Sequence, residues 1–94
     1  MTNHKDWKFS TKAIHIGNKA DKESGSVSPP IHLTSTFKQD AVGQTRGFDY
    51  SRVSNPTRQR LEENLASLDN AKHAICFSTG MAATTALFQL FDSG

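Results

Sequence analysis

Residues 74–84 constrain the fold of this chain more than any other stretch, because they have the composition of a strand that leads directly into a helix. Residues 74–77 are mostly apolar and have the length of a short buried strand. Residues 78–80, Ser-Thr-Gly, combine two residue types that cap helix N-termini with one that permits a sharp turn. Residues 81–91 are largely apolar and lack proline and glycine, which predicts a buried helix.

The turn at residues 78–81 is a candidate anion site. A helix that begins at such a turn leaves backbone N–H groups without partners, and the positive end of its dipole favours an anion, most often a phosphate. The turn lacks the glycine and lysine spacing of a P-loop and the three glycines of a dinucleotide fingerprint, so nucleotide binding is disfavoured. The alternative is a well-capped helix that binds no ligand.

Composition limits the classes of protein to consider. The chain has 94 residues, enough for one small domain. Its net charge of +2 is too weak and too scattered to favour a nucleic acid or an anionic membrane as partner. A single cysteine, Cys76, rules out an intrachain disulfide and fits a reducing compartment. No apolar stretch has the length of a membrane span and the N-terminus does not resemble a secretory signal, so a soluble cytoplasmic protein is expected.

The first half of the chain is predicted to contain little regular structure. Residues 1–9 are polar and are expected to be frayed. A short helix is predicted to begin with Ser10 or Thr11 as its N-cap and to stop at Gly17. After two consecutive prolines, residues 31–37 alternate in polarity, which predicts an extended arm or an edge strand. Residues 38–54 show no periodicity and are predicted to form a long loop.

A second helix is predicted to begin at Asn55-Pro56-Thr57, with asparagine as N-cap and proline at the first helical position. Its apolar face carries three leucines, Leu61, Leu65 and Leu68, and it is predicted to end at residues 69–70. The chain therefore offers one central strand between helices. A buried strand of this type needs neighbours, so the prediction is an incomplete α/β fold whose remaining strands lie beyond Gly94.

The loop before this helix is a second candidate anion site. Tyr50 and Arg52 lie close together in it, and an arginine fork with a phenol hydroxyl can bind phosphate oxygens. The alternative is a solvated loop with a surface arginine.

The other residues that could carry chemistry give no site. Cys76 is interpreted as a buried small hydrophobe and not a nucleophile. The histidines lack the spacing of metal ligands, so no metal site is predicted. Ser78 does not lie in the Gly-x-Ser-x-Gly elbow of a hydrolase.

Three stretches carry a specific resemblance when they are taken together. They are residues 48–58 (Phe-Asp-Tyr-Ser-Arg-Val-Ser-Asn-Pro-Thr-Arg), the helix with Leu61, Glu62 and Leu68, and residues 77–83 (Phe-Ser-Thr-Gly-Met-Ala-Ala). This pattern resembles the N-terminal part of the Cys/Met-metabolism enzymes that depend on pyridoxal phosphate, which include cystathionine γ-synthase, cystathionine γ-lyase and methionine γ-lyase. Residues 11–17 and 29–37 support the resemblance, which extends over nearly the whole chain.

The resemblance implies a fold-type I α/β enzyme, with residues 1–55 as an N-terminal arm and subunit-contacting loop and residues 56–94 as the start of the cofactor-binding domain. It implies pyridoxal 5′-phosphate as cofactor and a homo-oligomer, a tetramer in the full-length family. The expected cofactor-binding residues are Gly80 and Met81 in their own subunit and Tyr50 and Arg52 in a neighbour's site. Asp49 matches an acidic residue of the γ-synthase and γ-lyase members.

The resemblance also implies a lyase or transferase that acts at the γ-carbon of a sulfur amino acid or an acylated homoserine. These residues do not distinguish a γ-lyase from a γ-synthase. The family's Schiff-base lysine, pyridine-binding aspartate and stacking aromatic residue match positions beyond Gly94, so no catalytic residue is assigned. The chain is expected to be a truncated product or a piece of a longer enzyme and to be inactive alone. The alternatives are a non-catalytic subunit-interaction module and a stand-alone phosphate-binding domain.

Overall fold

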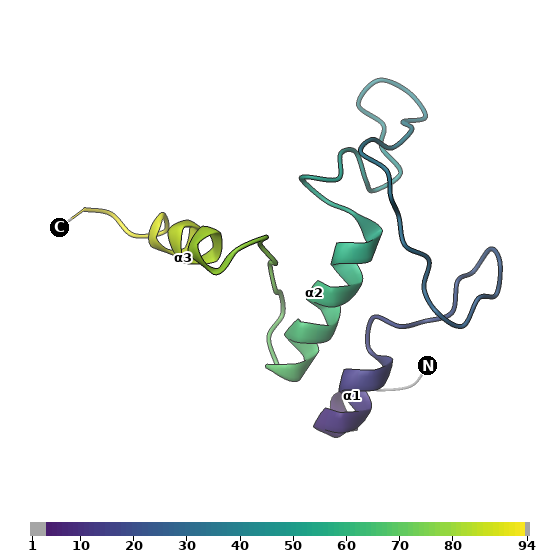
Figure 1. Ribbon diagram of the computed structural model, residues 1–94, viewed down its shortest axis with the longest axis horizontal. Coiled ribbons are helices and arrows are strands. Elements are labelled where there is room, and N and C mark those ends of the chain that lie inside the picture. Colours follow the sequence, from purple (N-terminus) through teal and green to yellow (C-terminus); the bar gives the residue numbers. More distant parts are fainter. Residues whose placement is uncertain (1–3, 94) are drawn as a thin grey trace.

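The computed structural model describes residues 4–93, and this part of the chain contains helices but no β-strand. Its elements, in chain order, are the 3₁₀-helix η1 (His4–Asp6), α1 (Phe9–His15), α2 (Pro56–Leu68) and α3 (Gly80–Phe88). Figure 1 shows α1 beside α2, with α3 projecting away from both. None of these helices is long and apolar enough to cross a membrane.

The helix α1 begins earlier than predicted. It starts at Phe9, and its N-cap is Lys8, whose side chain makes no capping hydrogen bond, so the prediction of Ser10 or Thr11 as cap was wrong. The prediction of a frayed start was also wrong for residues 4–6, which form η1, while residues 1–3 lie outside the described part. Gly17 has the positive φ of +80° that is typical of a glycine just after a helix, as predicted.

Asn64 attaches α1 to α2. Its side-chain Nδ2 lies within hydrogen-bond distance of three carbonyl oxygens near the C-terminal end of α1, those of Lys12 (3.2 Å), Ala13 (3.1 Å) and Ile16 (2.8 Å). Gly17 permits this close approach, because a β-carbon there would lie 2.3 Å from the carbonyl oxygen of Arg60. Ala66 on α2, 7% exposed, is the one buried hydrophobic side chain among residues 4–93.

The extended arm contacts the second half of the long loop around one isolated bridge. Thr36 and Tyr50 form an isolated antiparallel bridge, so residues 31–37 form an arm and the alternative of an edge strand is wrong. Two backbone hydrogen bonds flank this bridge: Phe37 N–H to the Asp49 carbonyl (3.0 Å) and Ser51 N–H to the Ser35 carbonyl (2.9 Å). The loop predicted over residues 38–54 is confirmed, and the arm holds its second half in place.

The helix α2 begins and ends as predicted. The side-chain oxygen of Asn55 accepts a hydrogen bond from the Thr57 N–H at 2.8 Å, and proline occupies the first helical position. The amide nitrogen of Asn55 also donates to the His32 carbonyl (3.3 Å) and to the Ser51 hydroxyl (2.9 Å). One side chain therefore caps the helix and ties both the arm and the loop to its N-terminus.

The strand predicted over residues 74–77 does not form in the described part of the chain. These residues run as an irregular segment beside α2, and Ile75 is 75% exposed. A strand needs a neighbouring strand to pair with its backbone, and no other segment of residues 4–93 supplies one. Cys76 is half-buried, so its interpretation as a buried small hydrophobe was also wrong.

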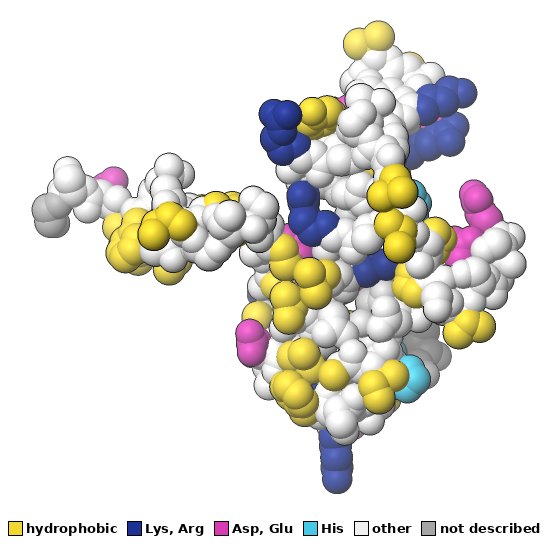
Figure 2. Space-filling view, in the orientation of Figure 1, with side chains coloured by type: hydrophobic (Ala, Val, Ile, Leu, Met, Phe, Trp, Pro, Cys, Tyr) yellow, Lys and Arg dark blue, Asp and Glu magenta, His cyan; other side chains and the backbone are white. Residues whose placement is uncertain are grey.

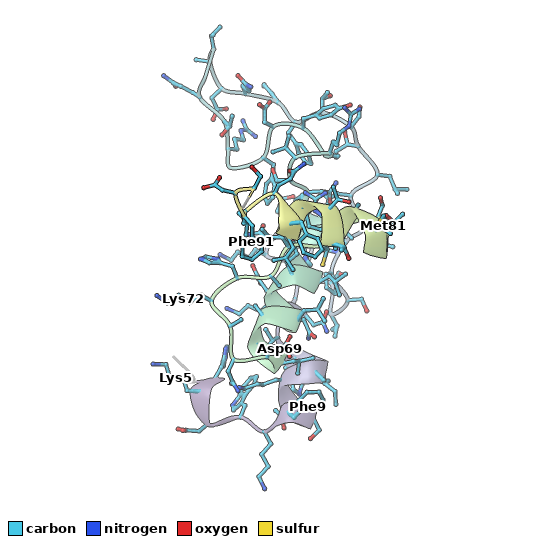
Figure 3. All side chains as sticks on the ribbon, turned by 90° about the vertical axis from the view of Figure 1, so that its left-hand side faces the viewer. Lys5, Phe9, Asp69, Lys72, Met81 and Phe91 are labelled. Carbon is cyan, nitrogen blue, oxygen red and sulfur yellow. The ribbon has the colours of Figure 1, made fainter. Side chains whose placement is uncertain are left out.

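The helix α3 is shorter and more exposed than predicted. It ends at Phe88 instead of Phe91, and none of its side chains is buried. Figure 3 shows Met81 at one end of this helix and Phe91 beyond the other, and Figure 2 shows hydrophobic side chains along the projecting part. Met81 is 73% exposed. The prediction of a buried helix was wrong, because no other described segment covers α3.

Candidate functional site

Tyr50 and Arg52 lie next to each other in the long loop. The Arg52 Nη2 atom donates to the Tyr50 hydroxyl at 3.1 Å, and the guanidinium carbon lies 5.2 Å from the centre of the Tyr50 ring. This is the distance range of a cation–π interaction, which orients the guanidinium. No carboxylate among residues 4–93 forms an ion pair with Arg52. Its charge is therefore available to an anion from outside the chain.

Arg58 of α2 supports the backbone of the same loop. Its Nη1 atom donates to the carbonyl oxygens of Ser51 (3.3 Å) and Arg52 (3.4 Å), and its Nη2 atom donates to that of Val53. Backbone carbonyls on both sides of the Arg52 side chain are thus held by one guanidinium. The planar guanidinium group carries several N–H donors, so one arginine side chain can bind these three neighbouring carbonyl oxygens.

The turn before α3 has the geometry of a helix N-terminus that can receive an anion. Thr79 is the N-cap, as predicted, and its side-chain oxygen accepts the Ala82 N–H at 3.0 Å. Within residues 4–93, the N–H groups of Gly80 and Met81 have no hydrogen-bond acceptor. A β-carbon at Gly80 would meet nothing within 4 Å, so the space beside the turn is open. Two free N–H groups and the helix dipole therefore face an accessible site.

The two predicted stretches lie apart within this chain. A groove of about 760 Å³ separates the loop from the segment before α3, and Arg52, Arg58, Glu62 and Phe77 are among its lining residues. The turn at residues 80–81 is not part of that lining. No hydrogen bond or ring contact within residues 4–93 joins either residue of the loop pair to either residue of the turn. Figure 1 shows the same separation, with α3 pointing away from the loop.

The remaining polar residues show little that indicates further chemistry. No group of three or more histidine, cysteine, aspartate or glutamate side chains within residues 4–93 has the arrangement of a metal site. Hydrogen bonds from the hydroxyl and the backbone N–H of Ser24 lower the pKa of Asp21, which lies in the polar loop after α1. This carboxylate stabilises a turn and is not part of either candidate anion site.

Sequence reasoning missed the supporting roles of Arg58 and Glu62. The Glu62 Oε2 atom accepts the Cys76 N–H at 2.8 Å, and its Oε1 atom lies 3.9 Å from the Nε atom of Arg58. The available signal was the spacing of these two opposite charges, four residues apart on a predicted helix. Their contacts with the loop and with residue 76 depend on the tertiary arrangement and have no local pattern.

A sequence model of the family described as Cys/Met metabolism PLP-dependent enzyme matches residues 10–94. The chain belongs to this family. The match confirms the resemblance derived from the sequence and, with it, pyridoxal phosphate as the cofactor of the family. It does not favour the alternative of a non-catalytic interaction or phosphate-binding module.

Curated relatives carry the names of two related activities. The chain is 49% identical over 87 residues to the putative cystathionine gamma-lyase 2 of Caenorhabditis elegans and 48% identical over 87 residues to the cystathionine gamma-lyase of Homo sapiens. It is 44% identical over 84 residues to the cystathionine gamma-synthase/O-acetylhomoserine (thiol)-lyase of Bacillus subtilis. The three alignments cover 92%, 92% and 89% of this chain, respectively, but each covers 22% of the relative. The chain therefore spans about a fifth of the length of these proteins.

Solved structures agree with this assignment. The metB structure from Corynebacterium glutamicum superposes with a TM-score of 0.89 at 42% identity, over 95% of this chain and 23% of that chain. Cystathionine gamma-lyase from yeast superposes with a TM-score of 0.84 at 42% identity, over 97% of this chain and 23% of that one. The predicted fold class, an incomplete part of an α/β enzyme of this family, is confirmed.

Proposed function

We propose that this chain is the N-terminal portion of a pyridoxal-phosphate-dependent transsulfuration enzyme of the cystathionine γ-lyase or γ-synthase type. The family match over residues 10–94 carries this proposal, because it includes both candidate anion sites. The substrate class is an amino acid of sulfur metabolism, as the names of the relatives indicate. The cytoplasm is the proposed location, and the single cysteine with a free thiol supports it.

The residues present fit the phosphate of the cofactor. Gly80 and Met81 offer two free N–H donors at a helix N-terminus, and the space beside Gly80 is open. Arg52 offers an unpaired positive charge, and its neighbour Tyr50 offers a hydroxyl. We therefore propose these four residues as cofactor-binding residues.

The separation of the two stretches supports a shared site between subunits. Because the loop pair and the turn make no contact with each other in one chain, we propose that they serve different cofactor sites in a homo-oligomer, which we propose to be a tetramer. Residues 1–55 would then form an arm and subunit-contacting loop, and residues 56–94 the start of the cofactor-binding domain. The start of α2 directly after its N-cap Asn55 supports this division.

The contribution of this chain is to bind and orient the cofactor. When bound, pyridoxal phosphate supplies an electron sink for a carbanion on the substrate. The N–H groups of Gly80 and Met81 would donate to the phosphate, and Arg52 would balance its charge. We assign no catalytic residue to the chain. The purified chain alone is expected to release no keto acid from cystathionine, and release at an enzymatic rate would overturn this assignment.

Equilibrium dialysis with pyridoxal phosphate and with pyridoxal tests the proposed function. The two ligands share the ring and the aldehyde and differ in the phosphate, which the proposed residues recognise. We expect weak binding of pyridoxal phosphate to the chain and no measurable binding of pyridoxal. Equal binding of the two ligands, or no binding of pyridoxal phosphate, would contradict the assignment of these residues to the phosphate.

A further inference from the structure

Two residues of α2, Arg58 and Glu62, form a polar connection between the candidate loop and the segment that leads to the candidate turn. They are four residues apart, so they lie on the same side of the helix. The Nε atom of Arg58 lies 3.9 Å from the Oε1 atom of Glu62, and their side chains are 31% and 21% exposed. The pair is therefore partly shielded from solvent, which strengthens its interaction relative to a surface pair.

Each member of the pair also holds a different segment. Arg58 donates to the backbone carbonyls of the three consecutive loop residues 51–53, which include Arg52. Glu62 uses its second carboxylate oxygen, Oε2, to accept the Cys76 N–H at 2.8 Å. The two oxygens of one carboxylate thus contact the support of the loop, through Arg58, and the segment before the turn separately. A neutral amide at this position has one oxygen acceptor and cannot replace both contacts.

The contact with Cys76 holds a segment that is otherwise weakly attached. Among the described residues, no other hydrogen bond or ion pair connects residues 72–78 with the rest of the chain. Gly80 follows Cys76 by four residues, so the position of the turn depends on where this segment is anchored. The anchor is a charged acceptor in partly shielded surroundings, and such hydrogen bonds are stronger than those between neutral groups.

We propose that Arg58 and Glu62 are positioning residues for the cofactor phosphate. Arg58 fixes the loop backbone around Arg52, and Glu62 fixes the approach to the turn at Gly80. The ion pair between them sets the distance from the loop to the segment before α3. This role rests on the proposed function, since it concerns residues proposed to bind pyridoxal phosphate.

Amide hydrogen exchange, followed by NMR on the 94-residue chain, tests the two halves of this connection without any cofactor. The Cys76 amide reports on the turn side. The Val53 and Ser54 amides, which both donate to the Tyr50 carbonyl at 2.9 Å, report on the loop side. Glu62→Ala is expected to accelerate exchange at Cys76 by about ten-fold or more, because a hydrogen bond to a charged group is lost.

Two further variants separate the ion pair from the hydrogen bond. Glu62→Gln keeps an acceptor for Cys76 but removes the charge opposite Arg58, so it is expected to accelerate exchange on the loop side more than at Cys76. Arg58→Lys is also expected to accelerate exchange more on the loop side than at Cys76, because a lysine cannot bind the three loop carbonyls together. The control Glu63→Ala removes the neighbouring carboxylate, which is exposed and has no hydrogen bond or ion pair with residues 4–93, and should change neither side. If Glu62→Ala lowers the helical circular-dichroism signal, Glu62→Gln carries the test.

Equilibrium dialysis with pyridoxal phosphate supplies the second readout. Glu62→Ala and Arg58→Lys are each expected to weaken binding by about ten-fold, and Glu63→Ala to leave it unchanged. Absence of binding to the unmodified chain would overturn the proposed function. Normal binding by that chain, with variants that alter neither affinity nor exchange, would overturn the positioning role alone.

Discussion

The guanidinium of Arg52 donates to the hydroxyl of Tyr50 at 3.1 Å and lies 5.2 Å from the centre of its ring. The phenol therefore orients a positive charge that has no carboxylate partner among residues 4–93. An oriented and unpaired guanidinium loses little conformational freedom when it binds a phosphate. Arg52 is therefore the charged member of the proposed set of cofactor-binding residues.

Removal of this charge should weaken binding of pyridoxal phosphate. Arg52→Gln keeps a hydrogen-bonding side chain but loses the charge, so we expect about a ten-fold or greater loss of affinity in equilibrium dialysis. The matched control is Arg46→Gln, which lies in the same loop and already pairs with Asp40 at 2.8 Å. An equal loss of affinity in both variants would indicate a non-specific effect of net charge and would contradict a specific site at Arg52.

The capping residue of α2 should separate two contributions to stability. Asn55→Ala removes the cap and both amide hydrogen bonds, and we expect a loss of about 2 kcal/mol in the free energy of unfolding. Asn55→Asp keeps the acceptor for the Thr57 N–H and should cost about 1 kcal/mol. Urea titration followed by circular dichroism measures both values. Equal losses in the free energy of unfolding would mean that the whole effect comes from the contacts of the amide with the arm and the loop. The capping hydrogen bond to Thr57 would then make no contribution to stability.

The glycine after α1 should be less tolerant of a side chain than other glycines with positive φ. Gly17→Ala places a β-carbon 2.3 Å from the Arg60 carbonyl oxygen, whereas Gly43 has a similar φ of +74° and nothing within 4 Å of such a carbon. Gly43→Ala should cost about 1 kcal/mol from its backbone conformation, and Gly17→Ala about 1 to 3 kcal/mol more from the clash. Equal costs in urea titration would mean that α1 does not pack on α2 in solution.

These local features were predictable to different degrees. The start of α2 follows from Asn-Pro-Thr because capping depends on adjacent residues. The start of α1 was missed because its N-cap, Lys8, makes no capping hydrogen bond and is not a residue type that predicts a helix start. The anion-ready turn at residues 78–81 was predicted for the same local reason as α2, and its cap at Thr79 is confirmed.

Features that depend on distant segments could not be predicted from the chain alone. Residues 74–77 have a strand-like composition, but pairing needs a neighbour that residues 4–93 do not contain. The apolar residues of α3 predicted burial, yet burial requires a covering surface. The link between Glu62 and Cys76 joins residues fourteen positions apart through a side chain, so neither periodicity nor capping rules indicate it.

The pKa of Asp21 gives a prediction about pH. Hydrogen bonds from Ser24 lower this pKa in the folded chain, so the carboxylate stabilises the fold above its unfolded pKa and loses this contribution as the pH falls through the folded value. Ser24→Ala should raise the pKa of Asp21 towards the ordinary aspartate value in an NMR titration. The control Ser35→Ala should not move it. An unchanged pKa in Ser24→Ala would show that the turn of residues 21–24 is not formed in solution.

We propose that the turn before α3 binds the phosphate of pyridoxal phosphate, and amide chemical shifts report on this binding at each residue of the turn. In a ¹H–¹⁵N NMR titration of the chain, the Gly80 and Met81 amides should shift with pyridoxal phosphate and stay unchanged with pyridoxal, because their free N–H groups face the open side of the turn. Absence of any shift at these two amides at saturating pyridoxal phosphate, or identical shifts with both ligands, would contradict the claim.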